Sequence, residues 1–243
     1  MSARPRPGAD SGREGRAGPP ASRRGEASPG AGDAAVAAEL AAGIDVLELR
    51  LDAAQHAALE RYVALLAKWN RTYNLTAIRE PSRMVTHHLL DSLAILPHLS
   101  QRAGLRVLDV GSGGGLPGIP LAIARPDWHV DLVDPVHKKA AFITQAALEL
   151  GLSNARAHAL RVEELVPSAP YDLVVSRAFA DLSTFVAAAG RHLAPGGSLV
   201  AMKGVHPAEE LAELGAAVVV TATPTVSVPG LDAARHLVFM QRP

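Results

Sequence analysis

A glycine-rich segment in the middle of the chain is the feature best suited to chemistry. It reads LRVLDVGSGGGLPGIP over residues 105–120, and its glycines follow directly after a short apolar run. Glycine adopts backbone conformations that other residues avoid, and it puts no side chain between the backbone and a ligand. Pro117 and Pro120 then suit the first turn of a helix. The segment predicts a strand, a ligand-binding loop containing Gly111 and Gly113, and the start of a helix.

Two classes of nucleoside ligand are compatible with this loop. Gly113, Gly115 and Gly118 satisfy the G-x-G-x-x-G spacing of dinucleotide-binding proteins, which is a weak signal when it stands alone. Asp109 favours the other ligand, because a carboxylate just before the glycines repels a pyrophosphate but suits a cation. The methionine end of S-adenosylmethionine carries such a charge. We therefore expect Asp109, Gly111 and Gly113 to bind S-adenosylmethionine.

Acidic and apolar residues after the next two predicted strands extend the nucleoside site. Asp134 closes the second strand, where a carboxylate can accept hydrogen bonds from both ribose hydroxyls. The same carboxylate could instead cap the following helix. Val162 and Glu163 follow the third strand, where methyltransferases commonly hold the adenine ring.

The segment after the fourth predicted strand bears on the methyl acceptor. Amine methyltransferases usually carry an Asn/Asp-Pro-Pro-aromatic motif there, whereas this chain has SRAFA at residues 176–180. Methylation of an exocyclic amine is therefore disfavoured. Arg177 could neutralise a phosphate and help to stack a base, or it could form an ion pair at the edge of the sheet.

A ring nitrogen such as guanine N7 is compatible with this pattern. It offers a free in-plane lone pair and has no proton to remove, so positioning can suffice without a general base. No obvious base motif is present. Lys203 leaves methylation of a ribose 2′-hydroxyl open, because a lysine held as the neutral amine can act as a base.

Short apolar runs alternate with helical segments from residue 105 onward and must position these side chains. Such repetition predicts an α/β fold with a parallel, doubly wound sheet and a ligand at the carboxyl ends of its strands. Strands are expected near 105–110, 128–133, 155–159, 173–176 and 198–202, and helices near 119–124, 137–150 and 182–192.

The last two predicted strands, 217–220 and 236–240, are joined by a loop that contains proline and glycine rather than by a helix. That connection predicts a terminal antiparallel hairpin. Such a hairpin distinguishes the Rossmann-like sheet of class I S-adenosylmethionine-dependent methyltransferases from the dinucleotide-binding sheet. Together with Asp109 it favours S-adenosylmethionine over NAD.

Helical patterns precede the sheet. Asp52 and Gln55 resemble an N-cap pair, and apolar residues then recur at helical spacing as far as Tyr73. A second helical stretch over 83–96 stops before Pro97.

Three parts of the chain follow from these patterns. Residues 1–33 are rich in Gly, Pro, Ala, Ser and Arg and contain no aromatic residue, so they predict a disordered tail. An amino-terminal helical subdomain over 34–100 and a methyltransferase domain over 101–243 would follow.

Composition narrows the possible functions. A formal charge of +0 and a pI near 7.2 give no global sign of a nucleic-acid binder. The absence of cysteine excludes thiolate zinc and iron–sulfur sites, and with them methylation through a thiolate adduct or a cysteine-bound cluster. No apolar run approaches the about 20 residues of a membrane span, so we expect a soluble protein.

A local basic cluster could supply RNA contacts that the net charge does not. Four cations flank two aromatic residues in it: Lys68, Arg71, Arg79 and Arg83 around Trp69 and Tyr73. Cations could bind phosphates and aromatic rings could stack bases, although helical spacing favours core positions for the two rings. His87 and His88 lack a third nearby ligand, so no metal site is expected, and His88 is better explained as a packing or hydrogen-bonding residue.

Several motifs in sequence order carry a resemblance to a known family. The chain resembles the RsmG family, also called GidB, from about Asp52 to Phe239. WNxxYNLT, GLPGIPLAI and SRAFA in this order are highly specific, whereas each motif alone is generic. The motifs are KWNRTYNLT (68–76), HLLDS (88–92), DVGSGGGLPGIPLAI (109–123), RVEE (161–164), SRAFA (176–180), MKG (202–204) and RHLV (235–238).

The resemblance implies a bacterial cytoplasmic enzyme that uses S-adenosylmethionine to methylate N7 of one guanine in 16S ribosomal RNA. The RNA could be free or lie in the small ribosomal subunit or an assembly precursor. Matching motif positions imply cofactor contacts at Gly111, Leu116, Val162, Glu163 and Arg177, with Asp134 at the ribose. No catalytic residue is implied, but four residues are candidates for positioning the substrate: Arg177, Lys203, Asn74 and His88.

Departures from the family pattern are confined to the long tail and to Pro135 and His137, which change the loop after Asp134. Two other functions stay open. One is a class I methyltransferase acting on a ribose hydroxyl or a small molecule. The other is a non-catalytic RNA-binding module that holds the cofactor.

Overall fold

The computed structural model describes residues 1–2 and 31–243. Most of the tail expected over 1–33 therefore lies outside the described residues. Helix α1 (Ala31–Val46) begins inside that range.

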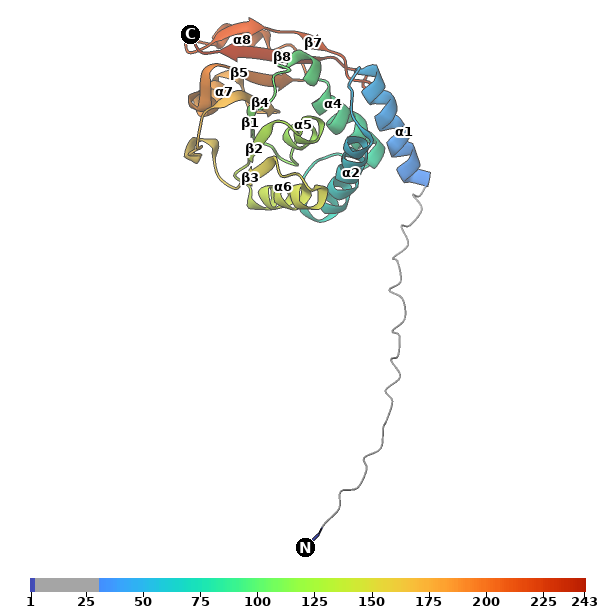
Figure 1. The fold of residues 1–243 in the computed structure, drawn as a ribbon. Helices are drawn as coiled ribbons and strands as arrows, with labels where there is room; N and C mark the ends of the chain where they lie inside the picture. Colours follow the sequence, from blue (N-terminus) through green and yellow to red (C-terminus); the bar gives the residue numbers. More distant parts are fainter. Residues whose placement is uncertain (3–30) are drawn as a thin grey trace.

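An eight-stranded sheet forms the centre of the fold (Figure 1). Its order is β3-β2-β1-β4-β5-β8-β6, and β7 also pairs with β8. The first five strands in the chain run parallel, whereas β8 runs antiparallel to β5 and β6. The predicted parallel sheet with a terminal antiparallel pair is confirmed. The strands are β1 (Arg106–Val110), β2 (His129–Val133), β3 (Ala155–His158), β4 (Tyr171–Arg177), β5 (Leu193–Lys203), β6 (Val219–Ala222), β7 (Thr225–Val226) and β8 (Arg235–Gln241).

Alternation along the strands gives each face of the sheet its own core. Val107 and Val175 belong to one core, which includes residues of α5 and α6, and Leu108 and Val174 belong to a second core with residues of α7. Helices on both faces explain why these strands are apolar almost throughout. The helices after β1 are α5 (Gly118–Ala124), α6 (His137–Leu150), α7 (Leu182–Ala189) and α8 (Ala208–Glu213), of which only α8 was not predicted.

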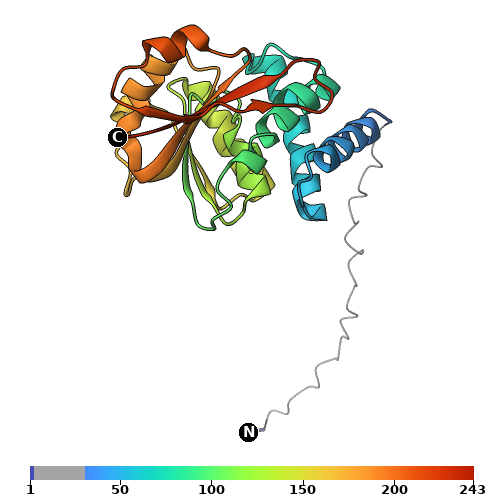
Figure 2. The same cartoon turned by 90° about the horizontal axis from the view of Figure 1, so that it is seen from above.

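The amino-terminal helices lie together on one side of the molecule, blue to cyan in Figure 2. Helix α2 (Ala53–Tyr73) begins at the predicted N-cap, since the side chains of Asp52 and Gln55 each accept a hydrogen bond from the other's backbone N–H. Leu40 of α1 and Leu66 of α2 share a hydrophobic core with α5 and the sheet. Within residues 1–2 and 31–243, no helix has the length and hydropathy needed to cross a bilayer.

The second predicted helical stretch is not one α-helix. It consists of α3 (Pro81–Met84), the π-helical turn η1 (Val85–Leu90), α4 (Asp91–Leu93) and the 3₁₀ turn η2 (Leu96–His98). The side chains of Thr86, His88 and Asp91 are buried there and bond to groups distant in sequence. Hydrophobic periodicity does not encode such contacts, so it could not indicate the π turn.

Candidate active site

The predicted site residues lie at one edge of the sheet, where the parallel strands end. The connections leave in opposite directions from β1 and β4, and this switch opens a crevice for a ligand in doubly wound sheets. Each parallel strand contributes at its end or just beyond it: Asp109 and Gly111 from β1, Asp134 from β2, Val162 and Glu163 from β3, Arg177 from β4 and Lys203 from β5.

Left-handed backbone angles shape the loop between β1 and α5, hereafter the glycine loop (residues 111–117). Gly111, Gly113 and Gly115 have φ of 72°, 58° and 85°, a region that glycine enters without strain. A Cβ on Gly111 would lie 3.5 Å from Cδ2 of Phe179 in the SRAFA motif, so the loops after β1 and β4 approach one another. The side chain of Leu116, a predicted cofactor contact, is buried in the core.

Asp109 lies beneath the glycine loop with no solvent exposure. Its Oδ2 accepts a hydrogen bond of 2.8 Å from the N–H of Gly118. Among the described residues, none forms a hydrogen bond with its Oδ1. Burial raises the pKa of Asp109 to about 7, although the bond from Gly118 opposes the shift. A buried carboxylate that lacks one partner is well suited to a nearby cation.

The third glycine of the G-x-G-x-x-G spacing has a packing role. A Cβ on Gly118 would lie 2.5 Å from Cδ2 of Leu132 and 2.7 Å from Oδ2 of Asp109. Close contact between α5 and the sheet therefore requires a glycine here whichever ligand binds. The terminal antiparallel strands, rather than the glycine spacing, distinguish the two ligand classes.

Asp134 is anchored beside the same loop. Its Oδ2 accepts from the N–H of Gly113 at 3.0 Å, and its Oδ1 accepts from the N–H of Val136 at 2.9 Å. The N-cap of α6 is Val136, which makes no side-chain cap, so Asp134 is not the capping residue. The alternative interpretation of Asp134 as a helix cap is therefore wrong. Its contacts hold Gly113 and Val136 in place, and Nζ of Lys139 lies 3.5 Å from its Oδ2.

The predicted adenine contacts lie on a 3₁₀ turn, η3 (Val162–Glu164), after β3. Val162 is buried, and its carbonyl accepts a hydrogen bond of 2.8 Å from Nε2 of His192. Glu163 is exposed. The pair thus offers one apolar and one carboxylate side chain from the same turn.

A cavity of about 370 Å³ adjoins the ends of β4 and β5, hereafter the acceptor pocket. Three of the four candidates for substrate positioning line it: Arg177, Lys203 and His88. Asn74 does not; it ends α2 in a left-handed conformation with φ of 49° and is exposed. The lining residues are Ile78, His87, His88, Asp91, Arg177, Ala178, Met202, Lys203, Gly204 and Arg235.

Asp91 joins three family motifs at this pocket. Its Oδ2 accepts from Nη1 of Arg177 at 3.0 Å, and its Oδ1 accepts from Nε of Arg235 at 2.8 Å. Arg177 also donates to the carbonyl of His87 at 3.0 Å. Asp91 is only 4% exposed to solvent, and both of its carboxylate oxygens are paired with guanidinium groups. Sequence reasoning missed Asp91, and only its place in the HLLDS motif could have indicated it.

A chain of hydrogen bonds holds His88 as a neutral side chain. The N–H of Ile78 donates to Oγ1 of Thr76, which lies 2.7 Å from Nε2 of His88. Nδ1 of His88 lies 2.9 Å from the carbonyl of His87, so Nδ1 carries the proton and Nε2 accepts one from Thr76. Burial, followed by the charge of Arg177, lowers the pKa of His88 to about 4. The packing interpretation of His88 is therefore favoured.

Lys203 is paired rather than free. Its Nζ donates to Oε1 and Oε2 of Glu210 on α8, at 3.0 and 2.7 Å. An ammonium group held between two carboxylate oxygens is a poor general base. This contact weighs against the ribose hydroxyl as the methyl acceptor.

The basic cluster lies on and after the last turn of α2. Lys68, Arg71, Arg79 and Arg83 are all exposed. Trp69 is partly buried against Phe142, as expected for a core residue, with ring centroids 5.5 Å apart. Tyr73 differs from that expectation: it is 39% exposed and lies against Trp69, with ring centroids 5.1 Å apart.

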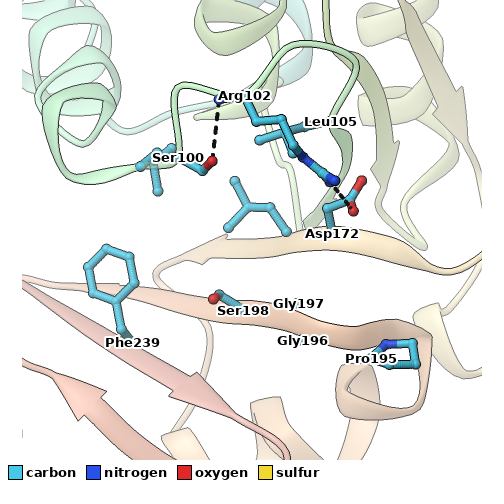
Figure 3. Close-up of a pocket in the computed structure, with 11 residues that line it drawn as sticks. Ser100, Arg102, Leu105, Asp172, Pro195, Gly196, Gly197, Ser198 and Phe239 are labelled. Atoms are coloured by element: carbon cyan, nitrogen blue, oxygen red, sulfur yellow. Dashed lines mark hydrogen bonds and ion pairs between the residues drawn. The ribbon is translucent and has the colours of Figure 1, made fainter.

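Another cavity, of about 250 Å³, lies at the amino ends of β1 and β4 (Figure 3). Arg102 and Asp172 form an ion pair in its wall. None of the predicted site residues lines this cavity.

Asp109 should make the stability of the protein depend on pH. Because its pKa in the folded chain lies above the ordinary carboxyl value, the stability it contributes is greatest below about pH 4 and is lost as the pH rises to about 7. We expect the urea midpoint of Asp109→Asn to fall less than that of the wild type between about pH 5 and about pH 8. The lowered pKa of His88 makes stability rise with pH instead, but this contribution is common to both proteins. Parallel pH profiles would contradict the raised pKa.

Strand order and loop placement together define a class of protein. A parallel sheet that ends in antiparallel strands, with a glycine loop after its first strand, is the fold of class I S-adenosylmethionine-dependent methyltransferases. NodS from Bradyrhizobium japonicum, solved with S-adenosyl-L-homocysteine, shares the fold with a TM-score of 0.51 at 16% identity, over 74% of this chain and 98% of that one. A SAM-dependent methyltransferase from Aquifex aeolicus gives 0.51 at 18% identity, over 72% and 97%.

Within that class, the chain belongs to the GidB family, rRNA small subunit methyltransferase G, whose model matches residues 55–238. A protein of that name from Chromobacterium violaceum is 55% identical over 203 residues, which cover 84% of this chain and 96% of the relative. Another from Burkholderia ambifaria is 56% identical over 200 residues, covering 81% and 88%. The resemblance predicted from the motifs is confirmed.

Proposed function

We propose that this protein transfers a methyl group from S-adenosylmethionine to N7 of one guanine in 16S ribosomal RNA. The observation that carries the choice of acceptor is the state of the titratable groups at the acceptor pocket. His88 is neutral and hydrogen-bonded, Lys203 is paired with Glu210, and Asp91 is paired with two arginines. None of these three groups is free to accept a proton, which suits an acceptor that has no proton to lose.

The residues of the crevice fit S-adenosylmethionine. Asp109 offers a buried carboxylate with one oxygen lacking a partner, which favours a cationic ligand nearby. Gly111 and Gly113 leave backbone open to a ligand, and Asp134, Val162 and Glu163 stand where the nucleoside would bind. When bound, the cofactor supplies a methyl group on a positively charged sulfur.

In this proposal, Arg177 orients the guanine that accepts the methyl group. It ends β4 next to the glycine loop and is held by Asp91, so its position is set before the RNA arrives. Positioning of the ring nitrogen in line with the methyl carbon is then the main contribution of the chain. We assign Lys203 to binding phosphate or base oxygens, with its ion pair to Glu210 exchanged for the RNA.

Incubation of the protein with labelled S-adenosylmethionine and small ribosomal subunits from a strain that lacks the enzyme tests the function. We expect the label to lie in 16S RNA at one guanine. Borohydride followed by aniline should cleave the RNA at that nucleotide, as it does at 7-methylguanine. Label that resists this cleavage would exclude N7, and no label in RNA would contradict the enzyme on this substrate. Free 16S RNA in a parallel reaction distinguishes naked RNA from a ribosomal particle as the substrate.

The basic cluster should bind RNA phosphates next to the acceptor pocket. Arg79 follows Ile78, which lines that pocket, and Arg71 lies on the last turn of α2. Reversing both charges, Arg71→Glu with Arg79→Glu, should weaken RNA binding and reduce the slope of log K against log salt by about one for each lost phosphate contact. Arg156→Glu, on the exposed face of edge strand β3, is the control and should change neither. An unchanged slope in the double variant would contradict this surface.

A further inference from the structure

We infer that Tyr62 of α2 is a positioning residue that holds the glycine loop in its ligand-binding conformation, an inference that rests on the proposed function. Tyr62 is fully buried, and its Oη donates a hydrogen bond to the carbonyl of Gly114, in the middle of the loop. The same hydroxyl lies 3.3 Å from the place of a Cβ on Gly115. A phenol on an amino-terminal helix thus reaches the loop that follows β1.

Helix α2 holds both ends of the unit formed by the glycine loop and α5. Near the loop, Cδ1 of Leu66 would lie 3.1 Å from a Cβ on Gly114. At the far end, Nε2 of Gln55 donates to the carbonyls of Ile123 and Ala124, at 2.9 and 3.0 Å. Those carbonyls lie in the last turn of α5, where a helix leaves its acceptors unsatisfied. The loop and its helix are therefore fixed to α2 as one body.

A single hydroxyl matters here because the loop has little conformational preference of its own. Glycine populates both signs of φ, and Gly113, Gly114 and Gly115 are consecutive. Asp134 anchors the loop from the β2 side through the N–H of Gly113, and Tyr62 anchors it from the α2 side. Apparent affinity falls in proportion to the fraction of molecules in the binding conformation. Loss of one anchor should therefore weaken ligand binding without a change in any residue that touches the ligand.

The two arms of the test are Tyr62→Phe and Tyr171→Phe. Tyr171 is an equally buried tyrosine at the opposite edge of the sheet, where its Oη donates to Oδ2 of Asp131 at 2.9 Å. Each substitution keeps the ring and removes one hydrogen bond, which is buried at Tyr62 and partly buried at Tyr171, so both should lower thermal stability. Only Tyr62→Phe should affect the glycine loop.

Calorimetric titration with S-adenosylhomocysteine should show Kd raised about fivefold to tenfold in Tyr62→Phe and within about twofold of wild type in Tyr171→Phe. In steady-state methylation, Tyr62→Phe should raise KM for the methyl donor by a similar factor and leave kcat within about twofold. Unchanged Kd in Tyr62→Phe, or an equal loss in Tyr171→Phe, would overturn the inference while the proposed function stood. Wild-type protein that binds no S-adenosylhomocysteine would overturn the proposed function instead.

Discussion

Replacement of Gly111 by valine is expected to abolish binding of S-adenosylhomocysteine and to leave most of the fold intact. Gly111 has φ of 72°, and a Cβ there would lie 3.5 Å from Cδ2 of Phe179. The two methyl groups of valine would extend into the remaining space between the loops after β1 and β4. We expect a loss in affinity of more than about 100-fold, measured by calorimetry. The left-handed backbone should cost about 1–2 kcal/mol of stability.

The matched control for this substitution is Gly104→Val. Gly104 precedes β1 at the other end of the strand and has φ of 71°, and a Cβ there would meet nothing within 4 Å. The Gly104→Val variant should lose a similar amount of its free energy of unfolding and keep its affinity for S-adenosylhomocysteine. Binding retained in Gly111→Val would show that the cofactor site is elsewhere. Binding lost in both variants would mean that backbone strain, not the space beside Phe179, is the cause.

Replacement of Asp91 by alanine is expected to have the largest effect on stability. The substitution leaves the guanidinium groups of Arg177 and Arg235 without their shared carboxylate in a site where both side chains are about one-fifth exposed. Breaking one partner out of a buried ion pair costs about 3–5 kcal/mol, and the partial exposure of the arginines favours the lower end. Methylation should fall as well, because Arg177 loses the contact that positions it. Urea unfolding and the ribosomal methylation assay measure the two effects.

Arg102→Ala provides the comparison for Asp91. Its ion pair with Asp172 lies at the opposite edge of the sheet, and the Arg102 side chain is 63% exposed. Solvent screens such a pair, so its loss should cost less than about 1 kcal/mol and leave methylation unchanged. Equal losses in the two variants would contradict the importance of burial. Full methylation by Asp91→Ala would contradict the positioning of Arg177.

The strands and the glycine loop could be predicted because local patterns encode them. Apolar runs located β1 to β4 to within about two residues at each end, and the glycine loop follows β1 directly. The run at 198–202 located only the second half of β5, which begins at Leu193. The capping pair of Asp52 and Gln55 could be predicted because the two residues lie only three positions apart in the sequence. Parallel strands end at one edge, so the gathering of Asp109, Asp134 and Arg177 there followed from topology.

The hydrogen-bond partners of those side chains could not be predicted from the sequence. Asp91 bonds to Arg177 and to Arg235 across separations of 86 and 144 residues, and no local pattern reports such a pairing. The same holds for the bond from Tyr62 to Gly114, 52 residues away. The π turn around His88 depends on buried polar contacts of this kind, which is why periodicity predicted an ordinary helix.

The sequence by itself determined the class of fold, the position of the glycine loop and the family, since each depends on residue types at short or ordered spacing. Only the tertiary structure decided the state of the acceptor pocket, in which Lys203 is paired, His88 is neutral and Asp91 holds two arginines. It also decided that Gly118 serves packing and that Tyr62 contacts the loop. The physical reason is the same throughout: burial and hydrogen bonding set the charge and position of a side chain, and both come from residues distant in the chain.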